Sequence, residues 1–292
     1  MLQLQLVTLY DYVCHRYDTH LCLHSQRQSN NYQPDFTDQE LMTIYLFGII
    51  QRRFTMQDTY DYIQQHWADW FPQLPSYQAV NNRLNQMGWH FEVVAQGLTA
   101  ILQDWPALTD VRLTDSLPII LSKRPHSARV APQLADKGYC PTKQLYYHGF
   151  KLHLVGIDRL GAMPLPERMQ FSKASVHDLT ALRQYVAYLP QGCLVGDKAY
   201  WSAALNEHLL ARQQLDLLTP VKLKKGQKHL DAADKLFSAY VSRMRQPIES
   251  FFNWLIETTQ IQTAAKVRSE KGAVLHCLGR LAAGLYILVF NS

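Results

Sequence analysis

The chain has 292 residues, of which 47% are hydrophobic and 11% aromatic, enough to build one large or two modest globular domains. Lysine and arginine outnumber aspartate and glutamate 29 to 24, so the formal net charge of +5 permits a polyanionic partner without identifying one. The five cysteines are scattered and form no Cys-x-x-Cys pair. This argues against a disulfide framework or a zinc ribbon and favours a reducing cytoplasm.

Neither end of the chain predicts contact with a membrane. The first residues carry no basic segment before their apolar positions and no small-residue cleavage site, so they do not resemble a signal peptide. Residues 273–290 are strongly apolar, but His276 and Arg280 lie in their middle, where a bilayer disfavours them. We therefore expect residues 273–290 to form a buried helix.

Residues 1–105 are predicted to form an all-α region. Thr37 and Glu40 have the spacing of a capping box at the start of one helix, and a second helix ends before Pro72. A third begins with Ser76 as its N-cap. Its apolar residues step by three and four over positions 77–101, which predicts a single long helix.

The opposite face of this third helix is rich in side-chain amides. Amides can make bidentate contacts to adenine, and a helix after a turn is a common DNA-reading geometry. A solvated helix face has the same composition, so both interpretations stay open. The residues on this face are Gln78, Asn81, Asn82, Arg83, Asn85 and Gln86.

From residue 106 the pattern becomes that of an α/β domain extending to residue 292. Period-2 alternation predicts strands at 110–121 and 146–158, and a third strand is predicted at 163–172. They are followed by a helix at 178–189, a short strand at 193–197, a helix at 202–214, a strand at 215–221 and a last helical region. This order matches a ribonuclease-H-like mixed sheet flanked by helices.

Three acidic residues occupy positions that the pattern reserves for other side chains. Asp115 shares a strand face with Val111 and Leu113, where alternation calls for an apolar residue. Asp197 ends a buried strand, beyond which α/β proteins bind ligands. Glu249 is predicted in the opening turn of a helix, after Pro247.

Carboxylates so placed suit Mg²⁺, a hard ion that binds oxygen, and two such ions can support phosphoryl transfer. Each acid also has a structural interpretation: Asp115 could start a turn, Asp197 could cap a helix, and Glu249 could complement a helix dipole. Other acids considered are Asp136, Asp158, Asp178 and Glu257, of which Asp178 is predicted to be a helix N-cap.

The motifs together resemble the DDE transposases of bacterial insertion sequences, which belong to the ribonuclease-H-like superfamily. Residues 113–119 (LTDSLPI), 196–200 (GDKAY) and 245–255 (RQPIESFFNWL) resemble the three acidic motifs of that family. Residues 135–158, and the segment SVHDL at 175–179, are similar to the family as well. The helical stretches FTDQELMTIYLFGI and LPSYQAVNNRL are similar in kind.

The resemblance implies that Asp115, Asp197 and Glu249 bind two Mg²⁺ ions, for which Mn²⁺ can substitute. It further implies cleavage at the terminal inverted repeats with water as nucleophile, then joining of the freed 3′-hydroxyls to target DNA without a covalent protein intermediate. Arg245 would pair with the glutamate or contact DNA phosphate. The chain departs from many relatives at Ser242, where they carry tyrosine, and at Ile256, where they carry lysine.

The expected partner is double-stranded DNA, as element ends and as target. A basic stretch after the last predicted strand could contact phosphate or be a solvated loop; its lysines are Lys222, Lys224, Lys225 and Lys228. Because two DNA ends must meet, a homodimer on DNA is expected, in the bacterial cytoplasm and associated with the nucleoid when active. The alternatives are a ribonuclease-H-like hydrolytic nuclease, or a DNA-binding protein derived from a transposase.

Overall fold

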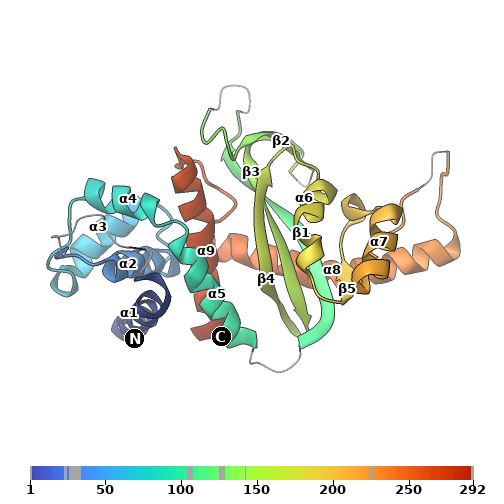
Figure 1. Ribbon diagram of the computed structural model, residues 1–292. Coiled ribbons are helices and arrows are strands. Elements are labelled where there is room, and N and C mark those ends of the chain that lie inside the picture. The colour runs from blue at the N-terminus through green and yellow to red at the C-terminus, as the bar shows by residue number, and fades with distance from the viewer. Residues whose placement is uncertain are drawn as a thin grey trace. The chain divides into compact units, whose positions relative to one another are not determined.

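The computed structural model describes residues 2–22, 25, 34–103, 108–124, 129–141, 143–223 and 226–290 (Figure 1). The chain divides into two compact units, one formed by Met1–Leu102 with Leu255–Ser292 and the other by Gln103–Trp254. We call them the helical unit and the α/β unit. Helix α8 (Ala232–Thr259) belongs to both, since the division falls at Trp254.

The helical unit is built from helices throughout its described residues. The predicted capping box is confirmed: the Glu40 N–H donates to Thr37 Oγ1 at 3.2 Å, and the Thr37 N–H donates to Glu40 Oε2 at 2.7 Å. Its elements are α1 (Leu2–Arg16), a π-helix (Tyr17–Leu21), α2 (Asp38–Ile50), α3 (Met56–His66), a 3₁₀ turn (Ala68–Trp70), α4 (Tyr77–Gln86), α5 (His90–Gln103) and α9 (Glu270–Phe290).

The single long helix expected from residue 77 onward is wrong, because α4 and α5 are separate helices. Ser76 is the N-cap of α4 as predicted. The break falls around Gly88, where an added Cβ would lie 2.8 Å from the backbone nitrogen of Leu275 in α9. Met87 and Phe91 are both fully buried on either side of the break. Periodicity alone therefore could not reveal it, since the apolar stripe continues across the turn.

Arg83 also departs from the expectation that it shares the exposed amide face of α4. Its Nε donates to Asp38 Oδ1 at 2.9 Å, and its Nη2 bonds to the other oxygen of the same carboxylate. Asp38 is only 5% exposed. The arginine therefore holds α4 against the start of α2.

Helix α9 is buried, as its internal His276 and Arg280 predicted. It is long and apolar enough to span a membrane by length and composition, yet 78% of its most apolar window is buried inside the protein. His276 Nε2 lies 2.8 Å from the Ile261 carbonyl oxygen, and Arg280 Nε donates to His276 Nδ1 at 3.2 Å. His276 is therefore a neutral ring that donates through Nε2 and accepts through Nδ1.

The α/β unit contains all the strands and helices that the sequence predicted, and one strand more. Its elements are β1 (Leu108–Ser122), β2 (Asp136–Cys140), β3 (Leu145–Arg159), β4 (Ala162–Lys173), α6 (Asp178–Tyr185), a 3₁₀ turn (Val186–Tyr188), β5 (Gly192–Val195), a 3₁₀ turn (Lys198–Tyr200), α7 (Ala203–Gln213), β6 (Leu215–Leu218) and most of α8. The additional strand is β2, which turns the small residues Gly138 and Cys140 inward and so lacks a strong apolar signal.

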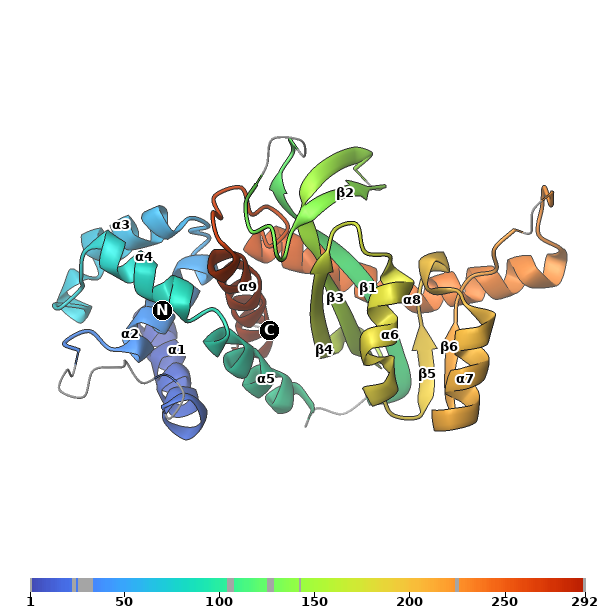
Figure 2. The same ribbon diagram turned by 45° about the horizontal axis from the view of Figure 1, so that its top comes forward.

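The strands form one mixed sheet in the order β2-β3-β1-β5-β6 (Figure 2). Strand β3 is antiparallel to β1, whereas β1, β5 and β6 run parallel. The remaining strands pair with successive parts of β3: β2 with residues 145–149 and β4 with residues 150–159. The predicted ribonuclease-H-like mixed sheet flanked by helices, preceded by a helical region, is thus confirmed.

The two faces of β1 contact different helices. Thr114 Oγ1 lies 3.4 Å from the Tyr185 hydroxyl of α6, whereas Asp115 is bonded to Arg245 of α8. Neighbouring residues of a strand point to opposite faces. Helix α6 therefore covers one face of the sheet, together with a buried cluster that reaches α7, and α8 covers the other.

Two local predictions in this unit are wrong. Pro247 lies inside α8 instead of in its first turn, although proline leaves one carbonyl of the preceding turn without its helical N–H partner. The helix continues because Val241 and Ile248, on either side of the proline, are fully buried. Glu249 therefore lies in the second half of α8, far from the dipole of its first turn. At α6 the N-cap is His177, and Asp178 is the first helical residue.

His276 makes the stability of the helical unit depend on pH. Burial, together with the charge of Arg280, lowers the pKa of His276 from 6.5 to about 3. The unfolded chain then binds more protons than the folded chain between pH 6.5 and 3. The contribution of neutral His276 to the free energy of unfolding is therefore fully present above pH 6.5, and it falls by up to about 1.4 kcal/mol for each pH unit below that. We expect the urea midpoint to drop accordingly.

The matched variants are H276Q, which removes this titration, and H208Q, which removes an exposed histidine. We expect H276Q to have a lower midpoint at pH 7.5 but a shallower decline toward pH 4.5, while H208Q follows the wild type. Some slope remains in H276Q, because burial also lowers the pKa of His153, to about 4. An undiminished slope in H276Q contradicts the prediction.

Candidate active site

The sheet brings the two aspartates to the same level on neighbouring strands. Leu113 of β1 pairs with Val195 of β5 in parallel register, and each aspartate follows its paired residue by two positions. The backbone at Asp197 is still extended, with ψ of 179°. Adjacent strands lie about 4.8 Å apart, so the backbones of Asp115, within β1, and Asp197, just after β5, lie side by side.

Asp197 also has the local structural role that its sequence position allowed. One of its carboxylate oxygens accepts the Ala199 N–H at 2.7 Å, which caps the short turn Lys198–Tyr200. The turn folds the fully buried Tyr200 ring back onto the strand end, where an added Cβ on Gly196 would lie 2.9 Å from a ring carbon. The motif GDKAY therefore fixes Asp197 through the Ala199 N–H that follows it and through the close packing of Tyr200 on Gly196.

The third acid approaches from α8 through an arginine. Arg245 Nη2 lies 3.3 Å from Asp115 Oδ2 and 3.1 Å from Glu249 Oε1. Arg245 is 13% exposed and Asp115 21%, while Glu249 is half exposed at 50%. The pairing of Arg245 with the glutamate is observed, and the same nitrogen also holds the first aspartate.

The electrostatics of this cluster centre on Asp115. Burial, together with the charges of Asp197 and Glu249, raises the pKa of Asp115 to about 7. The Arg245 charge and the Ser116 N–H, which donates to Asp115 Oδ1 at 2.8 Å, act in the opposite direction. Three carboxylates thus share one neighbourhood in which the cation of Arg245 provides partial compensation.

The donor set fits a hard divalent cation, because it consists of carboxylate oxygens only. Within the described part of the chain, however, no three His, Cys, Asp or Glu side chains are grouped closely enough to hold a metal ion. In the structure the guanidinium of Arg245 contacts both Asp115 and Glu249. The carboxylates are suitable ligands for a divalent ion, but in this structure two of them are paired with Arg245.

The basic stretch lies after β6. Lys222 is exposed, and its Nζ stands 5.8 Å from the centre of the Trp201 ring, which follows the turn capped by Asp197. Lys228 is exposed as well. Lys224 and Lys225 fall outside the described residues.

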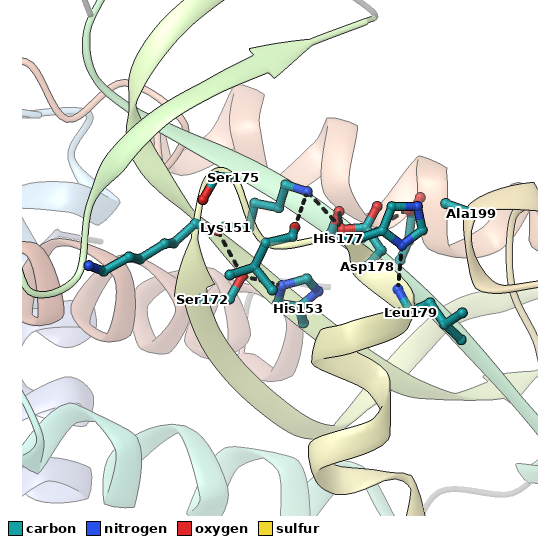
Figure 3. A network of polar contacts seen from close by, with 12 residues as sticks. Lys151, His153, Ser172, Ser175, His177, Asp178, Leu179 and Ala199 are labelled. Atoms are coloured by element: carbon teal, nitrogen blue, oxygen red, sulfur yellow. Dashed lines mark hydrogen bonds and ion pairs between the residues drawn. The ribbon is translucent and has the colours of Figure 1, made fainter. Parts of the chain in front are cut away.

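A second polar network, which sequence reasoning missed, lies on the α6 face of the sheet (Figure 3). Lys151 Nζ donates to Asp178 Oδ1 at 3.0 Å and to the Val176 carbonyl at 2.9 Å, and Ser116 Oγ donates to Asp178 Oδ1 at 3.1 Å. Ser116 is the neighbour of Asp115, so this network ties β1 to β3 and α6 beside the acid. The available signal was Lys151 itself, a charged residue in the largely buried middle of β3.

Comparison with known proteins identifies the family. A family model described as a transposase DDE domain matches residues 106–269, more than half of the chain. This chain belongs to the DDE transposases. The matched range contains Asp115, Asp197, Arg245 and Glu249. A search of curated proteins gave no match to this transposase.

Membership sets the broad class of this protein. DDE transposases are enzymes of a nuclease and transposase class, they act on DNA, and they generally use divalent metal ions. All of the α/β unit of this transposase lies within the matched range except residues 103–105. The sheet and α8 therefore form the domain that the family model describes.

Because Asp197 caps the turn through one oxygen, its charge can be removed by a substitution that keeps the cap and the fold. In D197N the side-chain oxygen still accepts the Ala199 N–H, whereas D197A loses that bond. We expect D197A to be less stable than D197N by about 0.5–2 kcal/mol, the usual contribution of such a cap. Urea unfolding of the three proteins at pH 7.5 measures the difference, and equal stabilities of D197N and D197A would refute the capping role.

Proposed function

We propose that this transposase cleaves DNA at the ends of its own element and joins the freed 3′-hydroxyls to target DNA, using Asp115, Asp197 and Glu249. One observation carries the proposal: a single nitrogen of Arg245 reaches both Asp115 and Glu249, next to strand β5, which Asp197 follows. Acids that repel one another at a half-buried site need a functional reason to be together.

The three carboxylates would hold two Mg²⁺ ions, or Mn²⁺ in their place. When bound, these ions supply the positive charge that activates the attacking oxygen and stabilises the leaving one. For these ions to bind, Arg245 would have to give up its contact with Asp115, while its ion pair with Glu249 would position that acid. The exposed Lys222 and Lys228 are proposed to contact the DNA backbone, since exposed lysines bind phosphate as point charges. Lys224 and Lys225, which lie outside the described residues, are proposed to do the same.

The division of labour expected from the sequence is also a proposal: residues 1–105 contact DNA and residues 106–292 carry out catalysis. The compact units divide the chain differently, since residues 255–292 pack with residues 1–102. A homodimer would bring two element ends together in the bacterial cytoplasm, in association with the nucleoid. A hydrolytic nuclease of the same fold is the second candidate, supported by the same acids.

Divalent ions are expected to stabilise the protein through these acids. At an ion concentration about 100 times the dissociation constant, binding adds about 2.7 kcal/mol of stability. We expect Mg²⁺ or Mn²⁺ to raise the unfolding temperature of the wild type but not of D115N or E249Q. E257Q is the matched control, because Glu257 is an exposed acid of the same helix. An equal shift in D115N and E249Q argues against ion binding at this site.

Catalysis is tested with D197N, which keeps its cap. The substrates are labelled duplexes from the DNA that flanks the gene, which should contain short inverted repeats. We expect Mg²⁺-dependent cleavage to fall by more than about 100-fold, since even the partners of metal ligands contribute 10- to 100-fold. DNA affinity should stay at the wild-type value, and E257Q should cleave normally.

The products separate the two candidate activities. Covalent joining of the labelled 3′ end to an added target duplex supports transposition. Cleavage without joined product, under conditions with excess target, supports the hydrolytic nuclease. Cleavage by D197N at the wild-type rate would remove the assignment of the three acids.

A further inference from the structure

A pocket of about 320 Å³ lies within the helical unit, and none of the three acids lines it. Its walls come from α4, from the segment that leads into α9, from α9 itself and from the chain around Phe54. The polar residues that line it are Tyr45, Thr55, Asn81, Asn85, Lys266, Arg268, Ser269, His276 and Arg280.

The charge of this pocket has one sign. Lys266, Arg268 and Arg280 line it, and its lining contains no aspartate or glutamate. Lys266 and Arg268 are exposed at the rim. Arg268 Nη1 donates to the carbonyls of Ala265 and Val267, at 2.7 and 3.0 Å, so its guanidinium is already positioned by its own loop. A concave surface whose described charged residues are all cations favours an anionic ligand.

Arg280 supplies an independent observation at the inner end of the pocket. It is only 5% exposed, yet its hydrogen bonds go to neutral acceptors: the carbonyls of Thr259 and Phe54, the latter at 2.6 Å, and His276 Nδ1 at 3.2 Å. Buried charges are normally paired with an opposite charge. A guanidinium has five N–H groups, so two of them have no partner among the described residues and could bind a ligand.

The pocket is continuous with the amide face of α4. Asn81 and Asn85 line it, and Asn85 Nδ2 donates to Asn81 Oδ1 at 3.3 Å and to the Asn81 carbonyl at 2.7 Å. The next amides along the same helix, Gln78, Asn82 and Gln86, are exposed. The cationic pocket therefore opens beside a polar surface that offers both donors and acceptors.

We propose that this pocket binds a backbone phosphate of duplex DNA, with α4 lying along the same DNA segment. The argument rests on the proposed function only for the identity of the polyanion. DNA is favoured over a free phosphate because a surface of amides next to the pocket gives a polymer further contacts, whereas a small anion would use the pocket alone. The site would hold DNA at a point separate from the catalytic acids.

The first test is the double variant K266Q/R268Q in the full-length protein. Binding to fluorescent duplexes from the flanking DNA is measured by anisotropy over a range of salt concentrations, without divalent ions. We expect affinity at 0.1 M salt to fall by about tenfold, and the log–log salt slope to become shallower by about 0.9 for each phosphate that the variant no longer neutralises. The control R52Q/K271Q removes the same charge from exposed positions of the same unit outside the pocket, and should match the wild type.

The sharper variant is N81D. An aspartate at this position still accepts the Asn85 amide, so the hydrogen bond within α4 survives while a negative charge enters the pocket. We expect N81D to weaken DNA binding at least as much as the double variant, with an unfolding temperature close to that of the wild type. Q64E, the same type of change at an exposed position of α3, should leave binding unchanged.

The outcomes decide between occupants. Wild-type affinity and salt slope in both K266Q/R268Q and N81D overturn the proposal. If inorganic phosphate stabilises the wild type at matched ionic strength while these variants still bind DNA normally, the pocket takes a small anion and DNA is excluded as its occupant. Because binding is measured without divalent ions, this failure would leave the D197N cleavage result unaffected, and the two proposals stand or fall separately.

Discussion

The α/β unit depends on one guanidinium shared between two carboxylates. Asp115 and Glu249 come from different elements, β1 and α8, and each would repel the other and Asp197 at short range. Arg245 lies within 3.3 Å of both, so α8 can pack its buried stripe on the sheet while carrying an acid toward the aspartates. Burial is the main cause that raises the pKa of Asp115 to about 7 despite this arginine, and the charges of Asp197 and Glu249 act in the same direction. A divalent ion among the three carboxylates would favour their charged forms.

The two faces of strand β1 carry different side chains: Asp115 on one face, and on the other a residue of the polar network beside α6. Asp115 points toward α8, and the next residue, Ser116, points toward α6, where it donates to Asp178. Lys151 of β3 completes that second network through the same carboxylate. The backbone that carries Asp115 is thus fixed from the face opposite to the three acids. A carboxylate that is to take part in a reaction must be held within narrow limits, and a hydrogen-bonded network on the far face can hold it without adding charge beside the acids.

The sequence predicted those features whose signal is local and periodic. The alternation of β1 marked Asp115 as an exception, and the end of the apolar run 193–195 marked Asp197, because period-2 burial is strict in a sheet. Glu249 was placed in the wrong part of its helix, since Pro247 is a strong helix-start signal that tertiary packing overrode. The break at Gly88 and the strand β2 were missed for a related reason: both depend on close packing against distant segments, α9 and β3, which periodicity within one segment cannot report. The ion pair of Arg245 with Asp115 joins residues far apart in sequence, so only the fold could reveal it.

Two arginines of the chain are paired with acids, whereas the buried Arg280 is bonded to neutral groups. Arg83 faces Asp38, Arg112 faces Glu167, and in each case an acid of the same unit balances the charge. Arg280 is at least as buried as these, but its described partners are two carbonyls and a neutral imidazole. Carbonyls satisfy the geometry of N–H groups without cancelling their charge, so the electrostatic requirement remains. Burial lowers the pKa of Arg280, yet arginine does not lose its proton in a folded protein at ordinary pH. The charge therefore persists inside the helical unit, and with Lys266 and Arg268 at the same pocket, the missing negative charge is best supplied from outside the chain.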